Sequence, residues 1–192
     1  MIRLAVVGDI GSGKSYVAKQ FGFPVFNADV EVNKLYKKNK KCYKKLKNAL
    51  PNYITSFPIK KNELSDAITF NKNNLRKIIK IVHPQIKKKM NNFLKKNKKK
   101  KIVVLDIPLL MENKIDKKSD IIIFVDAKKK EINKRLKKRV NFNPGIVKKL
   151  KEFQLPIELK KRKSDYVIKN NFRINSVKKD AKSLVKKILL NA

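Results

Sequence analysis

Short apolar runs without polar alternation are the clearest pattern in this chain. The first run covers residues 2–7 (IRLAVV) and is rich in β-branched side chains. A run of this kind is typical of a parallel strand that is buried on both faces. Four further strands are predicted from similar runs at residues 24–28, 101–106, 120–125 and 165–168.

Helical periodicity fills most of the segments between these runs. Apolar residues recur at intervals of three and four over residues 73–82, and a last amphipathic helix is predicted from about Ser176. Pro84 is predicted to begin a further helix, because proline is well tolerated at the first helical position. Residues 52–68 are predicted to form a loop with a short helix. Strands that alternate with helices predict an α/β domain, in which helices cover a parallel sheet on both faces.

Polar residues follow the predicted strands. All carboxyl ends of a parallel sheet lie at one edge, and ligands bind at that edge. It is expected to gather Asp29, Asp106, Asp126 and Asn170 together with the loop that follows the first strand. The functional site is therefore expected there.

That loop, Gly8 to Ser15, fits the pattern G-x-x-x-x-G-K-[ST] without a mismatch. It lies between a predicted strand and a predicted helix, which is the context that a phosphate-binding P-loop requires. Glycines let successive backbone N–H groups point toward an anion. The alternative is a glycine turn with a solvated lysine, which the full match in this context disfavours. The nucleotide is expected to contact Asp9, Ile10, Gly11, Ser12, Gly13, Lys14, Ser15 and Tyr16.

Two residues of the loop predict the cofactors. The Lys14 ammonium can reach the β- and γ-phosphates of a nucleoside triphosphate, and the Ser15 hydroxyl can ligate Mg²⁺. ATP and Mg²⁺ are therefore the expected cofactors.

The charge of the chain favours a polyanionic partner when it is taken alone. The formal net charge is +36, from 51 lysines and arginines against 15 acidic residues. Only six of these basic residues are arginine, and Asn and Ile are frequent, a composition typical of A+T-rich coding sequences. Basic runs such as residues 98–101 contain no aromatic residues of the kind that stack on single-stranded nucleic acid. We interpret the charge as a solvated surface and expect no specific nucleic-acid partner.

Cysteine, histidine and hydropathy exclude several classes of protein. Cys42 and His83 are the only residues of their types, so neither a disulfide framework nor a metal site built from histidines is expected. No apolar run approaches the roughly 20 residues that span a bilayer. The chain begins directly with a predicted strand, which leaves no room for a signal peptide. A single domain, residues 1–192, is expected, as a monomeric cytoplasmic protein without a membrane partner.

A basic, predominantly helical segment covers residues 129–163. Arg135 and Arg139 are four residues apart and are predicted to share one helix face. In a chain that uses lysine at most basic positions, this pair favours phosphate binding by the bidentate guanidinium group; the alternative is two ordinary surface cations. A turn is predicted at residues 141–145, followed by a second helix through Gln154. A basic helical hairpin at the ligand edge has the properties of a lid that excludes water.

Six motifs in order resemble the dephospho-coenzyme A kinase family over nearly the whole chain. They are residues 9–15, 27–29, 83–84, 108–112, 135–139 and 164–170. The resemblance implies a P-loop nucleoside-triphosphate hydrolase/kinase fold with a five-stranded parallel sheet. It also implies an inserted helical subdomain for the acceptor at residues 30–96, and a lid at 129–163. The implied reaction transfers the γ-phosphoryl group of ATP to the ribose 3′-hydroxyl of dephospho-CoA.

The resemblance also implies roles for single residues. The expected catalytic residues are Lys14, Asp29, Arg135 and Arg139. The expected substrate-binding residues are His83, Pro108, Leu109 and Glu112, and Asn170 is expected at the nucleotide.

Asp29 is the expected general base, because kinases hold a carboxylate near the attacking hydroxyl. The alternative for Asp29 is a helix N-cap ahead of Val30, with Asp106 as the next candidate for the base. The chain departs from the family pattern at Asn27, where the first carboxylate of Asp-Ala-Asp is absent. It departs also at Tyr16, which replaces threonine, and near residues 64–66, where an arginine has no counterpart. Two other functions remain open: a basic P-loop protein that binds nucleic acid, and a different small-molecule kinase of the same fold.

Overall fold

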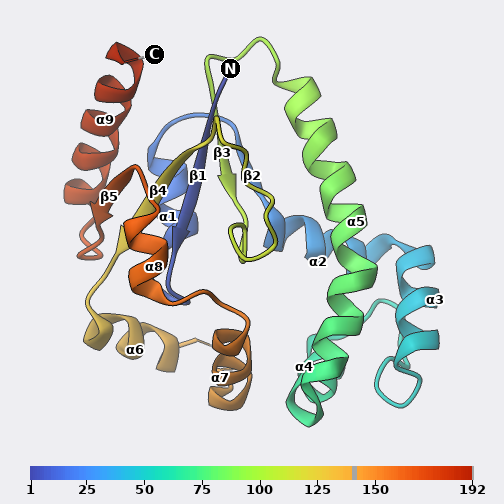
Figure 1. The fold of residues 1–192 in the computed structure, drawn as a ribbon. Helices are drawn as coiled ribbons and strands as arrows, with labels where there is room; N and C mark the ends of the chain where they lie inside the picture. The colour runs from blue at the N-terminus through green and yellow to red at the C-terminus, as the bar shows by residue number, and fades with distance from the viewer. Residues whose placement is uncertain (140–141, 192) are drawn as a thin grey trace. The chain divides into compact units, whose positions relative to one another are not determined.

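A single parallel sheet organises the strands of this computed structural model, which describes residues 1–139 and 142–191. Among these residues the sheet has five strands in the order β2-β3-β1-β4-β5 (Figure 1). Their bounds are β1 Ile2–Gly8, β2 Val25–Asn27, β3 Ile102–Asp106, β4 Ile121–Asp126 and β5 Tyr166–Lys169. All five predicted strands are confirmed, with ends that differ by one residue at most.

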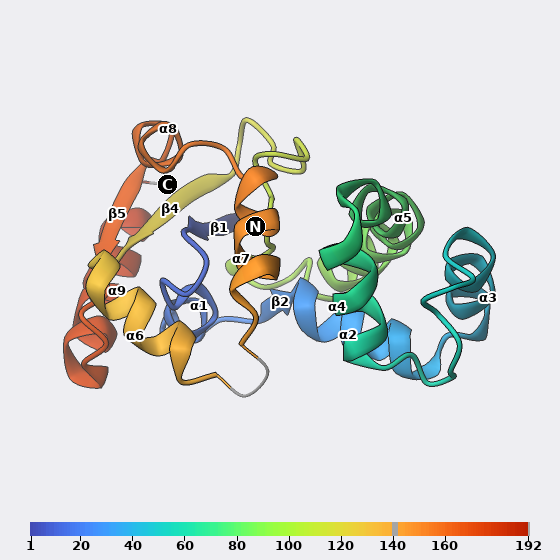
Figure 2. The same ribbon diagram turned by 90° about the horizontal axis from the view of Figure 1, so that it is seen from below.

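β1 lies at the centre of the sheet and is covered on both faces. Leu4 and Val6 belong to one buried cluster with Val17 and Ala18 of α1 (Lys14–Gln20) and with Val177 of α9 (Ile174–Leu190). The alternate residues of β1 are also buried, and α8 (Ile157–Arg162) packs against this strand from the other side of the sheet (Figure 2). Burial on both faces explains why the strands are apolar runs rather than alternating patterns.

The chain divides into two units by its internal contacts. The sheet unit comprises Met1–Asn27, Asn97–Phe142 and Phe153–Ala192, and it includes α6 (Lys129–Lys137). The helical unit comprises Ala28–Lys96 and Asn143–Glu152. Its helices are α2 Ala28–Lys38, α3 Lys40–Ala49, α4 Lys61–Phe70, α5 Lys72–Lys96 and α7 Pro144–Glu152. The segment 129–163 is thus shared between the units, and its role as a lid stays a prediction.

α5 runs without interruption through Pro84, so the prediction that a helix begins there was wrong. Proline removes one backbone donor and crowds the carbonyl group one turn earlier. Val82, Ile86 and Met90 nevertheless continue one buried stripe across this position. Because α2, α3 and α4 all pack against α5, burial of the whole stripe outweighs the local strain of the proline.

The chain after residue 139 also differs from the prediction. Asn141, in the predicted turn 141–145, lies outside the described residues. Pro144 opens α7, and the Asn143 side chain accepts a hydrogen bond from the backbone N–H of Ile146 (3.2 Å), which is typical of a helix start. α7 corresponds to the predicted second helix but ends at Glu152, two residues before Gln154, and α8 is a further helix of the segment 129–163.

Glu63 joins α4 to the loop before it. One carboxylate oxygen accepts bonds from the N–H and hydroxyl of Thr55 (3.0 and 2.7 Å) and from the N–H of Ser56 (2.8 Å). The other oxygen accepts the N–H of Lys60 (3.0 Å). Burial raises the pKa of Glu63, but these hydrogen bonds to the charged form outweigh it and lower the pKa to about 2.

Replacing Glu63 by glutamine is expected to lower the free energy of unfolding by about 2 kcal/mol at pH 7, because a buried donor loses its charged acceptor. The folded-state pKa lies below the unfolded value of 4.5, so the stabilisation is complete above that pH and is lost as the pH falls toward 2. Urea midpoints measured from pH 7 to pH 3 should therefore converge for wild type and Glu63→Gln. The exposed Glu152→Gln is the control. Equal midpoints at pH 7 would contradict the structural role of Glu63.

Candidate active site

The loop between β1 and α1 has the backbone geometry of a phosphate-binding loop. Gly11 and Gly13 adopt left-handed φ angles of 86° and 88°. A side chain at Gly13 would collide with the amide group of Asn170, so this position requires glycine for space as well as for backbone conformation. The hydroxyl group of Ser12 is buried and has no hydrogen-bond partner among the described residues.

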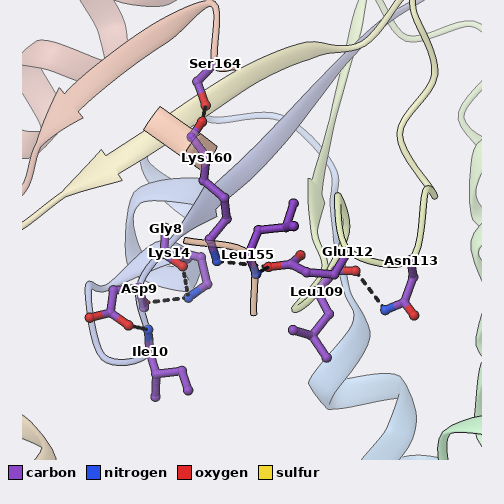
Figure 3. Close-up of polar contacts among 10 residues, drawn as sticks. All are labelled: Gly8, Asp9, Ile10, Lys14, Leu109, Glu112, Asn113, Leu155, Lys160 and Ser164. Atoms are coloured by element: carbon purple, nitrogen blue, oxygen red, sulfur yellow. Dashed lines mark hydrogen bonds and ion pairs between the residues drawn. The ribbon is translucent and has the colours of Figure 1, made fainter. Parts of the chain in front are cut away.

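The Lys14 side chain folds back over the loop (Figure 3). Its ammonium group donates to the carbonyl oxygens of Asp9 (2.8 Å) and Gly8 (3.3 Å). The Asp9 carboxylate accepts the N–H of Ile10 (2.7 Å), which fixes the first turn of the loop. The cation is thereby held at the loop by backbone oxygens, where a phosphate would meet it.

Ser15, Asn27 and Asp106 form a polar cluster at the carboxyl ends of β2 and β3. Asn27 and Asp106 are register partners in the sheet. The Asn27 amide donates to the Asp106 carboxylate and, at 3.4 Å, to the Ser15 hydroxyl. Asp106 is only 2% exposed, and burial raises its pKa; a hydrogen bond with Ser15, the Lys14 charge and the Asn27 bond partly offset this effect. The cluster places a buried carboxylate beside the P-loop serine.

Asn170 links the turn after β5 to the P-loop. Its buried amide donates to the carbonyl oxygen of Ser12 (2.8 Å) and accepts the N–H of Phe172 (2.9 Å). Phe172 has a left-handed φ of 62°, and the Arg135 guanidinium lies over its ring at 4.5 Å from the ring centre. A surface cavity next to this turn is lined by Asn170 and by residues that include Lys128 and Glu131. Arg135, the nucleotide loop and the cavity are therefore parts of one edge of the sheet unit.

A family model for dephospho-CoA kinase matches residues 2–176. The chain belongs to the dephospho-CoA kinase family. The dephospho-CoA kinase of Wolbachia pipientis wMel is 32% identical over 193 residues, which cover 98% of each chain. That of Bartonella quintana (strain Toulouse) is 30% identical over 193 residues, with the same coverage. The six motifs that resembled this family in the sequence thus identified it.

Solved structures support the fold. TT1252 from Thermus thermophilus has a TM-score of 0.77 at 24% identity, over 97% of each chain. Dephospho-CoA kinase from Campylobacter jejuni has a TM-score of 0.62 at 23% identity, over 97% of this chain and 96% of that one. Shikimate kinase from Acinetobacter baumannii reaches 0.53 at 14% identity, over 100% and 94%. The predicted P-loop kinase fold, with its all-parallel five-stranded sheet, is confirmed.

Asp29 and His83, two of the residues predicted to act on the acceptor, lie in the helical unit. α2 begins at Ala28, so Asp29 lies inside its first turn and is exposed; the alternative that it caps the helix ahead of Val30 was wrong. His83 lies within α5 and is half-buried, and burial lowers the pKa of its imidazole. Their roles toward the acceptor stay predictions.

Glu112 differs from the other predicted substrate-binding residues in its polar contacts. Pro108 and Leu109 are half-buried in the loop after β3. The Glu112 carboxylate accepts the backbone N–H of Leu155 (3.0 Å) and pairs with the Lys160 ammonium (3.1 Å). No local sequence pattern indicates this pair, because its members are far apart in the chain and lysine is frequent throughout.

The two arginines of this dephospho-CoA kinase family member do not share a helix. α6 ends at Lys137, so Arg139 lies beyond it, and the prediction of one common helix face was wrong. Ile132 and Leu136 of α6 are buried, and the residues that follow, Lys137 to Arg139, are exposed. Arg135 and Arg139 are both exposed.

Replacing Arg135 by lysine keeps the charge but removes the flat group that stacks on Phe172. We expect Arg135→Lys to reduce kcat/KM for ATP by about threefold to tenfold, and Arg139→Lys to have a comparable effect if it binds phosphate. Lys138→Arg is the matched control, with no expected change. Steady-state kinetics with varied ATP measure the three variants, and equal, negligible effects would make both arginines ordinary surface cations.

Proposed function

We propose that this chain transfers the γ-phosphoryl group of ATP to the ribose 3′-hydroxyl of dephospho-CoA, giving coenzyme A and ADP. The observation that carries the proposal is the edge of the sheet unit, where a complete P-loop, a folded-back Lys14 and a buried Asp106 come together. Membership of the dephospho-CoA kinase family supplies the acceptor.

The nucleotide is proposed to lie along residues 9–16 with its phosphates on the loop. The buried Ser12 hydroxyl is a donor that a phosphate oxygen would satisfy, and left-handed glycines direct backbone N–H groups toward an anion. The Asn170 side-chain amide stabilises the loop by donating a hydrogen bond to the Ser12 carbonyl oxygen. Lys14 offsets the charge that develops on the transferring phosphoryl group.

Mg²⁺ is proposed to bind at Ser15 and Asp106. The donors fit this ion, because Mg²⁺ takes hard oxygen ligands from one or two carboxylates and completes its shell with water and phosphate. The described residues hold no group of three or more His, Cys, Asp or Glu that would bind a metal unaided. When bound, Mg²⁺ neutralises charge on the phosphates. Asn27, which donates to the Asp106 carboxylate, orients it toward Ser15.

Asp106→Asn is expected to raise the Mg²⁺ concentration for half-maximal rate by about tenfold or more, because the amide is a neutral and weaker ligand. Asp126→Asn is the matched control, since Asp126 likewise ends a strand of the sheet, β4, but this strand is not adjacent to β3, and Asp126 pairs with Lys161. Metal titration by calorimetry in the presence of a nonhydrolysable nucleotide gives a readout that is independent of turnover. Unchanged Mg²⁺ dependence in Asp106→Asn would remove Asp106 from the metal site.

The acceptor is proposed to bind through the helical unit, with Asp29 as the base and His83 as a contact. Pro108 and Leu109, which belong to the sheet unit, are also proposed as substrate contacts. Asp29 comes two residues after the end of β2, at the carboxyl edge of the sheet. The proposed enzyme is a monomer in the cytoplasm and has no specific nucleic-acid partner. No helix in the described ranges has both the length and the apolar character of a membrane span.

An assay that couples ADP release to a range of acceptors tests the function. Dephospho-CoA is expected to be phosphorylated, and AMP, uridine and shikimate are expected to give only background hydrolysis of ATP. Shikimate is included because shikimate kinase shares the fold. Preference for any of the three other acceptors would replace the proposed substrate while leaving the kinase fold intact.

A further inference from the structure

The loop after β3 is a firmly held platform. Leu110 is 1% exposed, and Leu109 adopts a left-handed φ of 57°, which a non-glycine residue keeps only where its surroundings enforce it. Both the backbone N–H and the side-chain amide of Asn113 donate to the carbonyl oxygen of Leu109 (3.0 and 2.8 Å; Figure 3). Glu112 projects from this platform.

The Glu112 side chain is almost fully withdrawn from water. It is 9% exposed and its partner Lys160 is 3% exposed, with 3.1 Å between the charged atoms. The same carboxylate oxygen accepts the backbone N–H of Leu155 at 3.0 Å. A buried pair of this kind is strongly disrupted when one partner is removed, because an uncompensated charge is left inside.

Leu155, which the Glu112 carboxylate binds, lies in a segment that connects the two units. The chain leaves the sheet unit after Phe142, forms α7 in the helical unit and rejoins the sheet unit at Phe153. Residues 153–156, which we term the return segment, are therefore one of the covalent connections between the units. Lys160 lies in α8, the helix that follows, and Lys161 of the same helix pairs with Asp126 at the end of β4 (2.9 Å).

We propose that Glu112 is a positioning residue that fixes the return segment to the loop after β3, rather than a ligand of the acceptor. The inference rests on the proposed kinase function and restricts the moving part of its lid, residues 129–163, to the residues before Leu155. Because Leu155 and α8 are held, α7 can move only by rotation of the backbone immediately before Leu155. Glu112 thereby determines the position of the hinge. Its loss should make closure of the lid less complete and so admit water to the phosphoryl group.

Four variants test the proposal: Glu112→Gln, Lys160→Met, the double variant, and Asp120→Asn as the matched control. Asp120 also accepts a backbone N–H, from Lys117 (2.9 Å), and a buried cation, Arg3 (2.8 Å). Arg3 lies near the start of β1, away from the carboxyl edge. The control thus removes the same kind of buried charge without touching the return segment.

Two measurements are made on each variant. Hydrogen exchange of the peptide that contains Leu155 should be about tenfold faster in both single variants, because a charge-assisted bond is lost. The ratio of phosphorylated dephospho-CoA to ATP hydrolysed should fall by about threefold to tenfold in both, with the double variant no worse than either. Asp120→Asn should lower the thermal stability but leave the exchange rate of the Leu155 peptide and the ratio of phosphorylated dephospho-CoA to ATP hydrolysed at their wild-type values. If a single variant does not fold, the double variant, which buries no unpaired charge, supplies the same comparison.

If the Leu155 peptide exchanges hydrogen at the wild-type rate in Glu112→Gln and Lys160→Met, the proposal is overturned. A raised KM for dephospho-CoA in Glu112→Gln alone would also overturn it, since a ligand of the acceptor would act independently of Lys160. If wild-type protein fails to phosphorylate dephospho-CoA, the proposed function is wrong, whereas the exchange measurement still decides the role of Glu112.

Discussion

Lys14→Ala is expected to lower kcat by about a thousandfold while the melting temperature stays unchanged. In the folded protein the Lys14 ammonium donates to the backbone oxygens of Gly8 and Asp9. The Lys14 side chain is half-buried and is no part of the apolar core, so we expect the fold to lose little stability when it is removed. The transferring phosphoryl group, by contrast, loses the nearest cation supplied by the loop.

Turnover with dephospho-CoA and thermal unfolding measure this prediction together. Lys182→Ala, an exposed lysine of α9, is the control for loss of one positive charge from a chain with 51 basic residues. Retention of most of kcat in Lys14→Ala would remove the P-loop from the reaction.

Asp29→Asn is expected to lower kcat by between about a hundredfold and ten-thousandfold, the range for loss of a general base. Asparagine has nearly the same shape but cannot accept the proton of the ribose hydroxyl at neutral pH. Because Asp29 lies inside the first turn of α2, the amide at this position should leave the helix intact. The affinity for ATP should stay near the wild-type value, since residues 9–16 bind the nucleotide.

Single-turnover kinetics and nucleotide affinity separate the two effects. Asp66→Asn, which changes another exposed aspartate of the helical unit, is the control. Normal turnover in Asp29→Asn would move the base to another carboxylate, and Asp106 would be the next to test.

The sheet and the nucleotide loop were predictable from sequence because both depend on local patterns. An apolar run and a glycine-spaced motif carry their signal within a few residues. Asp106 was only partly predictable. The sequence placed it at the end of a strand, but its proximity to Asn27 and Ser15 follows from the strand order β2-β3-β1, which no local pattern reveals. The pairs of Glu112 with Lys160 and of Arg3 with Asp120 depend on contacts over long sequence separations, which no local pattern contains.

Errors in the prediction arose where packing overrides a local preference. Proline predicts a helix boundary from local sequence, but the buried stripe of α5 continues the helix through Pro84. The alternative that Asp29 caps a helix followed from the preference of aspartate for that position, whereas the helix begins at Ala28, which is buried.

The interrupted path of the helical unit has a consequence for synthesis. The Lys149 ammonium of α7 donates to the carbonyl oxygen of Thr69 in α4, 80 residues earlier in the chain. At about 5–20 residues per second, the ribosome delivers α7 about 4–16 s after α4. During this interval the side of α4 that α7 covers faces solvent, while β3 and β4 emerge. The helical unit can therefore complete its folding only after β1 to β4 have been synthesised. The two units are then expected to finish folding together rather than one after the other along the chain.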